Sequence, residues 1–227
     1  SSVVLVDLHP HFGDVALFLD IEPAHTLGDI AQNMARLDAT FLMSILARHS
    51  SGLYLLPSVN AVEQIGALTA ESAERTLELL QASFDYIIID SGHALADVTL
   101  AGLNMSPTIL LVSTLTLPVL RNTKRLLDIL SHLSYPTDSI KIIVNRYERH
   151  TEVSLKDMES VLKRKVFWLI PNDYFTTMNA INKGKPVSAF ARRADITKSF
   201  HKLTLSLTAE EGERKKASSL AKLFTSK

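Results

Sequence analysis

The sequence predicts an α/β protein, a three-layer sandwich in which helices cover both faces of a mostly parallel sheet. Two observations support this prediction. Short apolar runs rich in β-branched residues alternate with amphipathic stretches at helical spacing. Two of these runs end directly on an aspartate, Asp7 and Asp90. The first polar residue after a buried parallel strand lies at the carboxyl edge of the sheet, where open α/β folds bind their ligands.

The expected strands and helices follow one another along most of the chain. The strands should cover residues 3–6, 53–56, 86–89, 108–112, 140–144 and 166–170, and the helices residues 26–49, 69–83, 118–133, 154–163 and 174–183. Thr69 and Ser154 stand where helix N-caps belong, and acidic residues follow in the first turn. Gly184 and Pro186 mark the end of the helix that precedes them.

The composition is that of an ordinary globular protein in a reducing compartment. The 227 residues suffice for one large α/β domain. The 24 basic and 24 acidic residues cancel, which argues against broad electrostatic capture of nucleic acid. The absence of cysteine excludes disulfides and thiolate metal sites. No segment reaches the roughly 18 consecutive apolar residues of a membrane span. We therefore expect a cytoplasmic protein.

The charge pattern predicts a globular domain over residues 1–208 and a charged C-terminal tail over residues 209–227. The tail opens with a run of acidic and then basic residues, and apolar residues at helical spacing follow beside lysines. This pattern leaves two interpretations open. The tail is either a disordered, solvated segment or a weak amphipathic helix that lies on a membrane surface.

Polar residues follow each expected strand, and in a parallel sheet they should meet at one edge. They are Asp7, Ser58, Asp90, Ser113 with Thr114, Asn145 with Arg146, and Pro171 with Asn172 and Asp173. Mg²⁺ is usually held by one or two carboxylates together with phosphate oxygens. The pattern therefore favours a Mg²⁺–nucleotide site, although strand ends also meet polar loops in proteins that bind nothing there.

Six segments in a fixed order carry a family resemblance: residues 6–20, 84–90, 115–122, 144–147, 170–174 and 180–186. Through them the chain resembles the ParA/MinD superfamily of P-loop ATPases, and most closely its CpaE/TadZ branch, which serves the assembly of Flp-type pili. The resemblance covers nearly the whole chain and implies a P-loop NTPase-like fold. It also implies that ATP and Mg²⁺ are the ligands.

The resemblance assigns roles to individual residues. Asp7 matches the carboxylate near the γ-phosphate and the attacking water, and Asp90 matches the Walker B aspartate that holds Mg²⁺ through water. Arg121 matches a helix that borders the dimer or partner surface. The adenine-binding positions match two further groups of residues, the pair Asn145 and Arg146 and the loop of Pro171, Asn172 and Asp173.

The sequence departs from this family in three places. The glycine-rich loop with its Lys and Ser/Thr, which cradles phosphates, does not occur in the 227 residues, so the first strand and the P-loop are expected to be absent from this chain. His9 stands where relatives commonly carry a second acidic residue. Gly92 lies in a Ser-Gly-His turn after Asp90, where relatives have a proline-rich turn. These departures leave ATP hydrolysis open.

Three functions remain open at this stage. The first is an ATP-binding switch that homodimerises and positions a pilus or secretion apparatus, in the cytoplasm, at a cell pole or peripherally at the membrane. The second is a catalytically inactive scaffold of the same fold that acts through protein contacts. The third is a DNA-partitioning ATPase, which the zero net charge disfavours.

Overall fold

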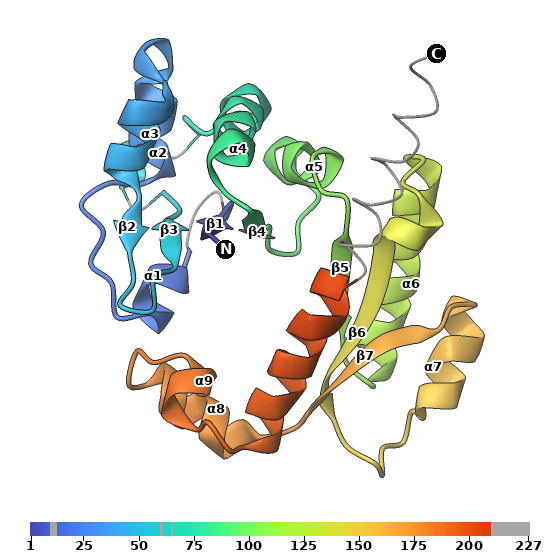
Figure 1. Cartoon of the computed structure of the whole chain (residues 1–227). Coiled ribbons are helices and arrows are strands. Elements are labelled where there is room, and N and C mark those ends of the chain that lie inside the picture. The colour runs from blue at the N-terminus through green and yellow to red at the C-terminus, as the bar shows by residue number, and fades with distance from the viewer. Residues whose placement is uncertain (10–12, 60, 65, 210–227) are drawn as a thin grey trace, which may run out of the picture. The chain divides into compact units, whose positions relative to one another are not determined.

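A computed structural model describes residues 1–9, 13–59, 61–64 and 66–209, and these form two compact units. Unit 1 comprises Ser1–Pro107 and Ile181–Pro186, and unit 2 comprises Thr108–Ala180 and the described residues from Val187 onward. Each unit has its own sheet, mostly parallel in unit 1 and fully parallel in unit 2, with helices packed against it (Figure 1). The structure thus confirms the predicted α/β fold with mostly parallel strands.

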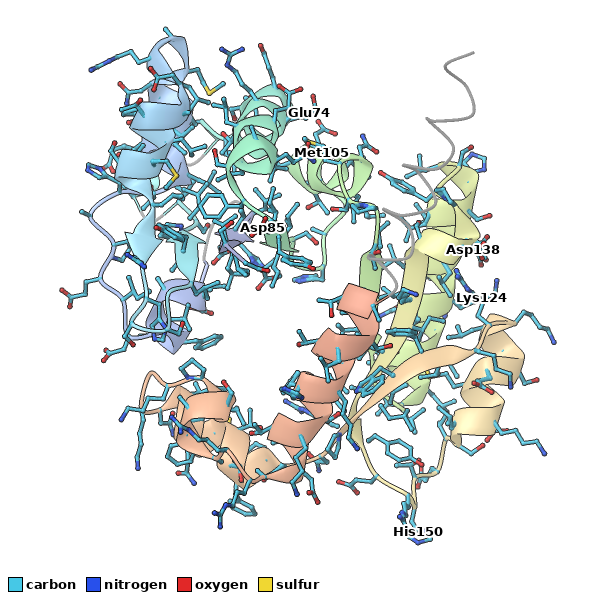
Figure 2. The ribbon with its side chains drawn as sticks, in the orientation of Figure 1. Glu74, Asp85, Met105, Lys124, Asp138 and His150 are labelled. Carbon is cyan, nitrogen blue, oxygen red and sulfur yellow. The ribbon has the colours of Figure 1, made fainter. Side chains whose placement is uncertain are left out.

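Unit 1 is organised around a four-stranded sheet with the order β2-β3-β1-β4. Its strands are β1 (Val3–Asp7), β2 (Ala47–Arg48), β3 (Tyr54–Leu56) and β4 (Tyr86–Asp90). Strand β1 pairs in parallel with both β3 and β4, whereas the short β2 pairs antiparallel with β3. The amino end of β1 is held beside β4, because the carboxylate of Asp85, labelled in Figure 2, accepts hydrogen bonds from the backbone and hydroxyl of Ser2.

The helices of unit 1 bury their apolar sides against this sheet. They are α1 (Val15–Phe18), α2 (Leu27–Gln32), α3 (Ala39–Ile45), α4 (Ala70–Ser83) and α5 (Asp97–Asn104), with 3-10 turns η1 (Met34–Arg36) and η2 (Val62–Gln64). Helix α4 contacts α2, α3 and α5. Val4 and Val6 of β1 are fully buried against Leu77 and Leu80 of α4 and their neighbours. Full burial of such a side chain contributes about 1.5–3 kcal/mol.

The prediction of one continuous helix over residues 26–49 was wrong. Helix α2 ends near Asn33, whose side-chain amide donates to the Asp29 carbonyl at 2.8 Å. A new helix, α3, begins after Asp38, whose carboxylate accepts from the backbone N–H of Phe41 at 2.8 Å. Asn and Asp favour such caps over helix interiors, because their side chains compete for backbone groups. The apolar periodicity continues through the break and conceals it.

Unit 2 has a three-stranded, fully parallel sheet with the order β5-β6-β7. Its elements are β5 (Ile109–Ser113), α6 (Leu117–His132), η3 (Thr137–Ser139), β6 (Ile140–Tyr147), α7 (Leu155–Leu162), β7 (Val166–Pro171), α8 (Tyr174–Ile181) and α9 (Val187–Phe190). Residues 195–209 are also helical. This last helix packs on β7, where the Trp168 indole donates to the Ser199 hydroxyl at 3.0 Å and that hydroxyl donates to the Leu169 carbonyl.

Each sheet has an apolar strand at one end of its strand order. Strand β4 ends the sheet of unit 1 with Ile88 54% exposed, and β5 ends the sheet of unit 2 with Val112 57% exposed. Parallel sheets are ordinarily covered on both faces, and apolar edge strands invite further pairing.

In the part of the chain that the structure describes, no helix has both the length and the apolar character needed to cross a membrane.

Candidate nucleotide-binding site

The two aspartates predicted to share a sheet edge lie side by side. Strands β1 and β4 pair in parallel over five positions, and Asp7 is the register partner of Asp90 at the carboxyl end. Neighbouring strands run about 4.8 Å apart, so the two side chains emerge close together. The expectation that these strand ends converge is therefore confirmed within unit 1.

Asp7 is enclosed by its surroundings and is only 1% exposed. One carboxylate oxygen, Oδ1, accepts from the backbone N–H of His9 at 3.2 Å and lies 3.1 Å from the Nδ1 atom of the same residue. The other oxygen, Oδ2, faces Gly13, where an added Cβ atom would lie only 2.2 Å from it. A side chain at residue 13 would therefore collide with the carboxylate, and glycine lets the backbone pass this close.

Burial dominates the electrostatics of Asp7. Removal from water disfavours the charged carboxylate and raises the pKa of Asp7 above its usual value, and the neighbouring charge of Asp90 raises it further. The hydrogen bonds from His9 oppose this shift without cancelling it. Asp90 is exposed, and its Oδ1 atom accepts from the backbone N–H of Gly92 at 3.3 Å. The two carboxylates at one edge thus have different environments.

His9 links the loops that follow three strands. Its backbone carbonyl accepts a hydrogen bond from the hydroxyl of Ser58, which follows β3 and is buried. Its imidazole reaches Gly92 after β4, where an added Cβ atom would lie 2.5 Å from Nε2. Gly92 has a φ of +66°, a conformation that favours glycine. In the sequence, His9 and Gly92 are departures from a family pattern, and nothing in their spacing predicts that they contact each other.

In unit 2, the predicted adenine-binding residues meet at the carboxyl edge of the three-stranded sheet. Strand β6 continues past its predicted end at residue 144 to Tyr147, so Asn145 and Arg146 lie within it. The pairing shifts register there, and Arg146 has a φ of +53°. This is the mark of a bulge, which re-aims side chains at a sheet edge. The Asn145 side-chain oxygen accepts from the Arg146 backbone N–H at 2.9 Å.

The loop after β7 is joined to this bulge. Pro171 is the register partner of Tyr147, and the backbone N–H of Asn172 donates to the Tyr147 carbonyl at 3.0 Å. The Asn172 amide also donates to Glu148. Asp173 accepts from the backbone N–H of residue 176 at 3.2 Å and so caps the start of α8. Glu148 was missed from the sequence, because nothing in its spacing connects it to Asn172.

The predicted partner residue Arg121 lies on the exposed side of α6. The opposite side of this helix is attached to its sheet by a buried contact, in which the hydroxyls of Ser113 and Thr123 lie 2.8 Å apart. Lys124, labelled in Figure 2, also lies on this helix and forms an ion pair with Asp128. Arg121 is therefore available to a partner, as an exposed residue on a firmly anchored helix.

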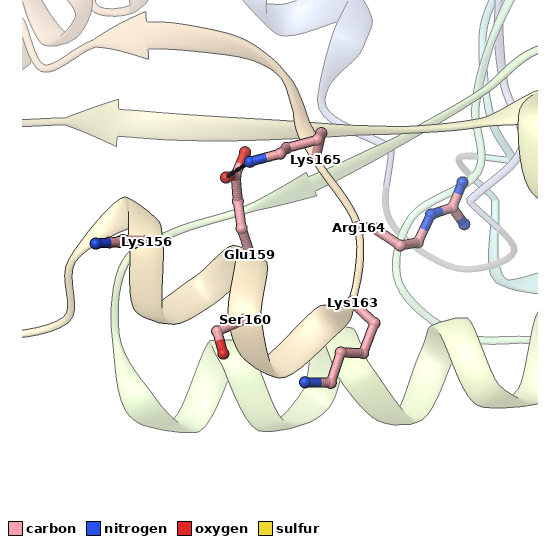
Figure 3. Close-up of a pocket in the computed structure, with 6 residues that line it drawn as sticks. All are labelled: Lys156, Glu159, Ser160, Lys163, Arg164 and Lys165. Atoms are coloured by element: carbon pink, nitrogen blue, oxygen red, sulfur yellow. Dashed lines mark hydrogen bonds and ion pairs between the residues drawn. The ribbon is translucent and has the colours of Figure 1, made fainter.

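A basic pocket of about 320 Å³ lies elsewhere in unit 2, between α7 and the start of β7 (Figure 3). It is lined by Lys156, Glu159, Ser160, Lys163, Arg164 and Lys165. Lys165 pairs with Glu159 at 2.6 Å and lowers the pKa of that carboxyl, and Arg164 donates to the carbonyls of Thr137 and Ile140. The pocket is at the amino end of β7, whereas the predicted site residues are at its carboxyl end.

Mg²⁺ prefers oxygen ligands, and the carboxylates of Asp7 and Asp90 are the candidates at this edge. Across the described residues, no three His, Asp or Glu side chains gather into a metal-binding group. Mg²⁺ at a nucleotide usually keeps its waters and needs only one or two carboxylates with the phosphates. Asp90 is an exposed carboxylate and fits this role, whereas the oxygens of Asp7 face His9 and Gly13. Asp90 is thus the residue at this edge suited to hold a hydrated cation.

Comparisons with known proteins agree with the α/β fold. No protein-family model matches the chain. The septum site-determining protein MinD of Thermotoga maritima is 23% identical over 202 residues, which cover 87% of this chain and 72% of that protein. A ParA family ATPase from Chlorobium tepidum has a TM-score of 0.85 and 26% identity, and the match covers 90% of this chain and 85% of that one.

A second solved structure shares the fold at lower identity. MinD of Pyrococcus horikoshii, solved as a complex with Mg-ADP, has a TM-score of 0.77 at 19% identity, and the match covers 91% of this chain and 83% of that one. Similarity therefore extends over most of the chain in both sequence and structure. The protein is accordingly a homologue of the ParA/MinD family of P-loop ATPases, with a P-loop NTPase-like α/β fold.

Proposed function

We propose that this protein is an ATP-binding switch of the ParA/MinD type, with a Mg²⁺ site at the carboxyl edge of the unit 1 sheet. The observation that carries the proposal is the in-register pair of Asp7 and Asp90 at the carboxyl end of β1 and β4. Open α/β sheets bind their ligands at this edge. The Mg-ADP complex of the Pyrococcus horikoshii MinD supports the choice of ligand.

In this proposal, each group of residues has a separate task. Asp90 would hold Mg²⁺ through water, and the metal would supply charge neutralisation at the phosphates. Asn145 and Arg146 lie against the adenine. The loop of Pro171, Asn172 and Asp173 closes over the base, and its attachment to Tyr147 and Glu148 keeps it in place. The protein contributes positioning and charge stabilisation, which are the main requirements of phosphoryl transfer.

The phosphates need a further partner that the 227 residues do not encode, namely a glycine-rich loop with its lysine. We propose that polypeptide outside this sequence supplies that loop together with the strand that leads into it. The exposed apolar strand β4 supports this idea. It is the outermost strand of its sheet on one side, it ends on Asp90, and it presents Ile88 to solvent. A strand added to β4 would cover that edge.

The biological role that we propose is to position or support a Flp-type pilus or secretion apparatus. Nucleotide state would bias a homodimer and so select which surface is offered to partners. Arg121 on the exposed side of α6 is our candidate for that surface. A MinD of Aquifex aeolicus has been solved as a complex with MinC, which supports a partner-binding role in general terms.

The test is nucleotide binding by the complete polypeptide, followed with a fluorescent ATP analogue in the presence of Mg²⁺. We expect Asp90→Ala to weaken Mg²⁺-dependent binding at least tenfold, because the hydrated cation loses its carboxylate. Asp138→Ala is the matched control, since Asp138 is an exposed aspartate in unit 2 outside the site (Figure 2). Equal binding by both variants would contradict the proposed site.

An inactive scaffold is the second candidate, favoured by the lack of a phosphate loop in the 227 residues and by the enclosure of Asp7. It predicts that the complete polypeptide binds no nucleotide, yet retains its protein partners. A DNA-partitioning role remains disfavoured by the zero net charge. Salt-dependent binding to nonspecific DNA would revive it.

A further inference from the structure

The imidazole of His9 is held in one orientation by a buried neighbour. Its Nδ1 atom lies 3.1 Å from Oδ1 of Asp7, which also accepts from the His9 backbone N–H at 3.2 Å. The hydroxyl of buried Ser58 donates to the His9 carbonyl. The side chain of His9 is 32% exposed, while that of Asp7 is 1% exposed. His9 therefore lies between the buried carboxylate of Asp7 and the solvent.

This arrangement selects one tautomer of the ring. A carboxylate can only accept hydrogen bonds, so the contact with Asp7 places the proton of the neutral imidazole on Nδ1. The Nε2 atom then carries a lone pair and can accept a proton. An imidazole oriented by a buried aspartate in this way is the usual construction of a general base.

The Nε2 atom points to the loop that follows Asp90. An added Cβ atom on Gly92 would lie 2.5 Å from Nε2 and 2.9 Å from Cδ2, so any other residue at position 92 would cover this nitrogen. The backbone N–H of Gly92 also donates to Asp90. The glycine therefore leaves room for Nε2, and it is bonded to Asp90, which is our candidate for holding hydrated Mg²⁺.

We propose that His9 is the general base for ATP hydrolysis in this protein, with Asp7 as its positioning residue. This inference rests on the proposed function. The oxygen of a water forms a bond to the γ-phosphorus while the bond from that phosphorus to the β,γ-bridging oxygen breaks. The electron pair of that bond leaves with ADP, and the proton of the water passes to Nε2 and then to solvent. The imidazole thus occupies the position where relatives commonly have a second carboxylate.

The first experiment compares two substitutions of His9 in the complete polypeptide. In His9→Asn, the amide can still donate to Asp7 but no atom reaches the place of Nε2. We expect the turnover rate constant to fall about 100-fold to 10,000-fold, the usual contribution of a general base. The affinity for a non-hydrolysable Mg²⁺–ATP analogue and the melting temperature should stay within error of the parent protein.

A purely structural role for His9 predicts a different pattern, with affinity, melting temperature and turnover falling together. Rescue by a small molecule separates the two roles further. In His9→Ala, free imidazole should restore part of the lost turnover, because it supplies the missing base. Parent-like turnover in His9→Asn, or failure of imidazole to rescue His9→Ala, would overturn the inference.

The second experiment places an atom against Nε2 and leaves His9 itself unchanged. Gly92→Ala places a methyl group against the ring at a positive φ, and we expect turnover to fall at least tenfold. Gly52→Ala is the matched control, because Gly52 has a φ of +91° and no atom lies within 4 Å of its added Cβ. An equal effect of the two variants on turnover would show that backbone strain alone matters and would contradict the inference.

A readout without turnover comes from the nitrogen chemical shifts of the His9 ring. We expect Nδ1 to be protonated and Nε2 unprotonated at a pH where the ring is neutral, and we expect Asp7→Leu to abolish this preference. The opposite tautomer would overturn the inference. Nucleotide binding without any turnover would overturn it and leave the proposed function standing, whereas a complete lack of nucleotide binding would contradict the proposed function itself.

Discussion

The carboxyl edges of the two sheets are built in different ways. At the edge of unit 1, Asp7, His9 and Ser58 interlock at close range, and Gly13 and Gly92 are present because no side chain would fit. At the edge of unit 2, a bulge in β6 and the loop after β7 present side chains that are exposed or half-buried. The first edge therefore depends on tight packing, and the second on backbone geometry.

This difference suits two separate tasks. Chemistry at a phosphate requires groups held to within a fraction of an ångström, which buried and mutually bonded side chains achieve. Recognition of a base by exposed or half-buried side chains tolerates more movement than chemistry at a phosphate does. We therefore expect overpacking of the first edge to cost stability and substitutions at the second edge to cost mainly affinity.

The largest effect on stability should come from Gly13→Ala. The added Cβ atom would lie 2.2 Å from Oδ2 of Asp7 and 2.4 Å from Cβ of Ser58, neither of which can withdraw easily from its buried position. Overpacking of this kind costs about 3 kcal/mol, and we expect that loss in the free energy of unfolding measured with urea. Gly66→Ala, at a glycine with open space around it, should cost less. An unchanged stability of Gly13→Ala would show that the first edge is looser than described.

Asp7→Asn should have a smaller effect on the free energy of unfolding, and this effect should depend on pH. Burial raises the pKa of Asp7 in the folded protein, so its contribution to stability is fully present below its unfolded pKa and is lost as pH rises through the folded value. Relative to Asp7→Asn, the parent protein should therefore become less stable between acidic and neutral pH. Urea unfolding at several pH values measures this difference.

The matched control for that experiment is Asp195, whose contribution to stability should change with pH in the opposite direction. Lys198 pairs with exposed Asp195 and lowers its pKa, so Asp195 contributes stability above its unfolded pKa that is lost as pH falls through the folded value. Relative to Asp195→Asn, the parent protein should lose stability on acidification. Parallel pH trends for the two aspartates would contradict the contrast between a buried and an exposed carboxylate.

The smallest effect on stability should come from Asn172→Ala in unit 2. Asn172 is exposed, and its side chain donates to the exposed Glu148, so we expect a cost of about 0.5 kcal/mol or less. Its loop is held by a backbone bond to Tyr147 that the substitution leaves in place. The affinity for an adenine nucleotide should nevertheless fall several-fold. A large loss of stability with unchanged affinity would reverse the roles that we assign to the two edges.

The sequence by itself determined the α/β fold, the six parallel strands and the placement of Asp7 beside Asp90. Its signals were local, since β-branched runs specify strands and a polar residue after each run marks the strand end. The resemblance to ParA/MinD proteins added the homology that the comparisons support. Local signals failed at the break between α2 and α3, where capping by Asn33 and Asp38 interrupts a helix without interrupting its apolar period.

Only the tertiary structure decided how the site residues use one another. The contact of His9 with Asp7 and Gly92, the close passage of Gly13 and the bond from Asn172 to Glu148 join residues on different loops. Such contacts depend on sub-ångström packing between segments up to about 80 residues apart, and no spacing in the sequence encodes them. The burial that raises the pKa of Asp7 is likewise a property of the packed sheet edge, because desolvation depends on every neighbour that excludes water.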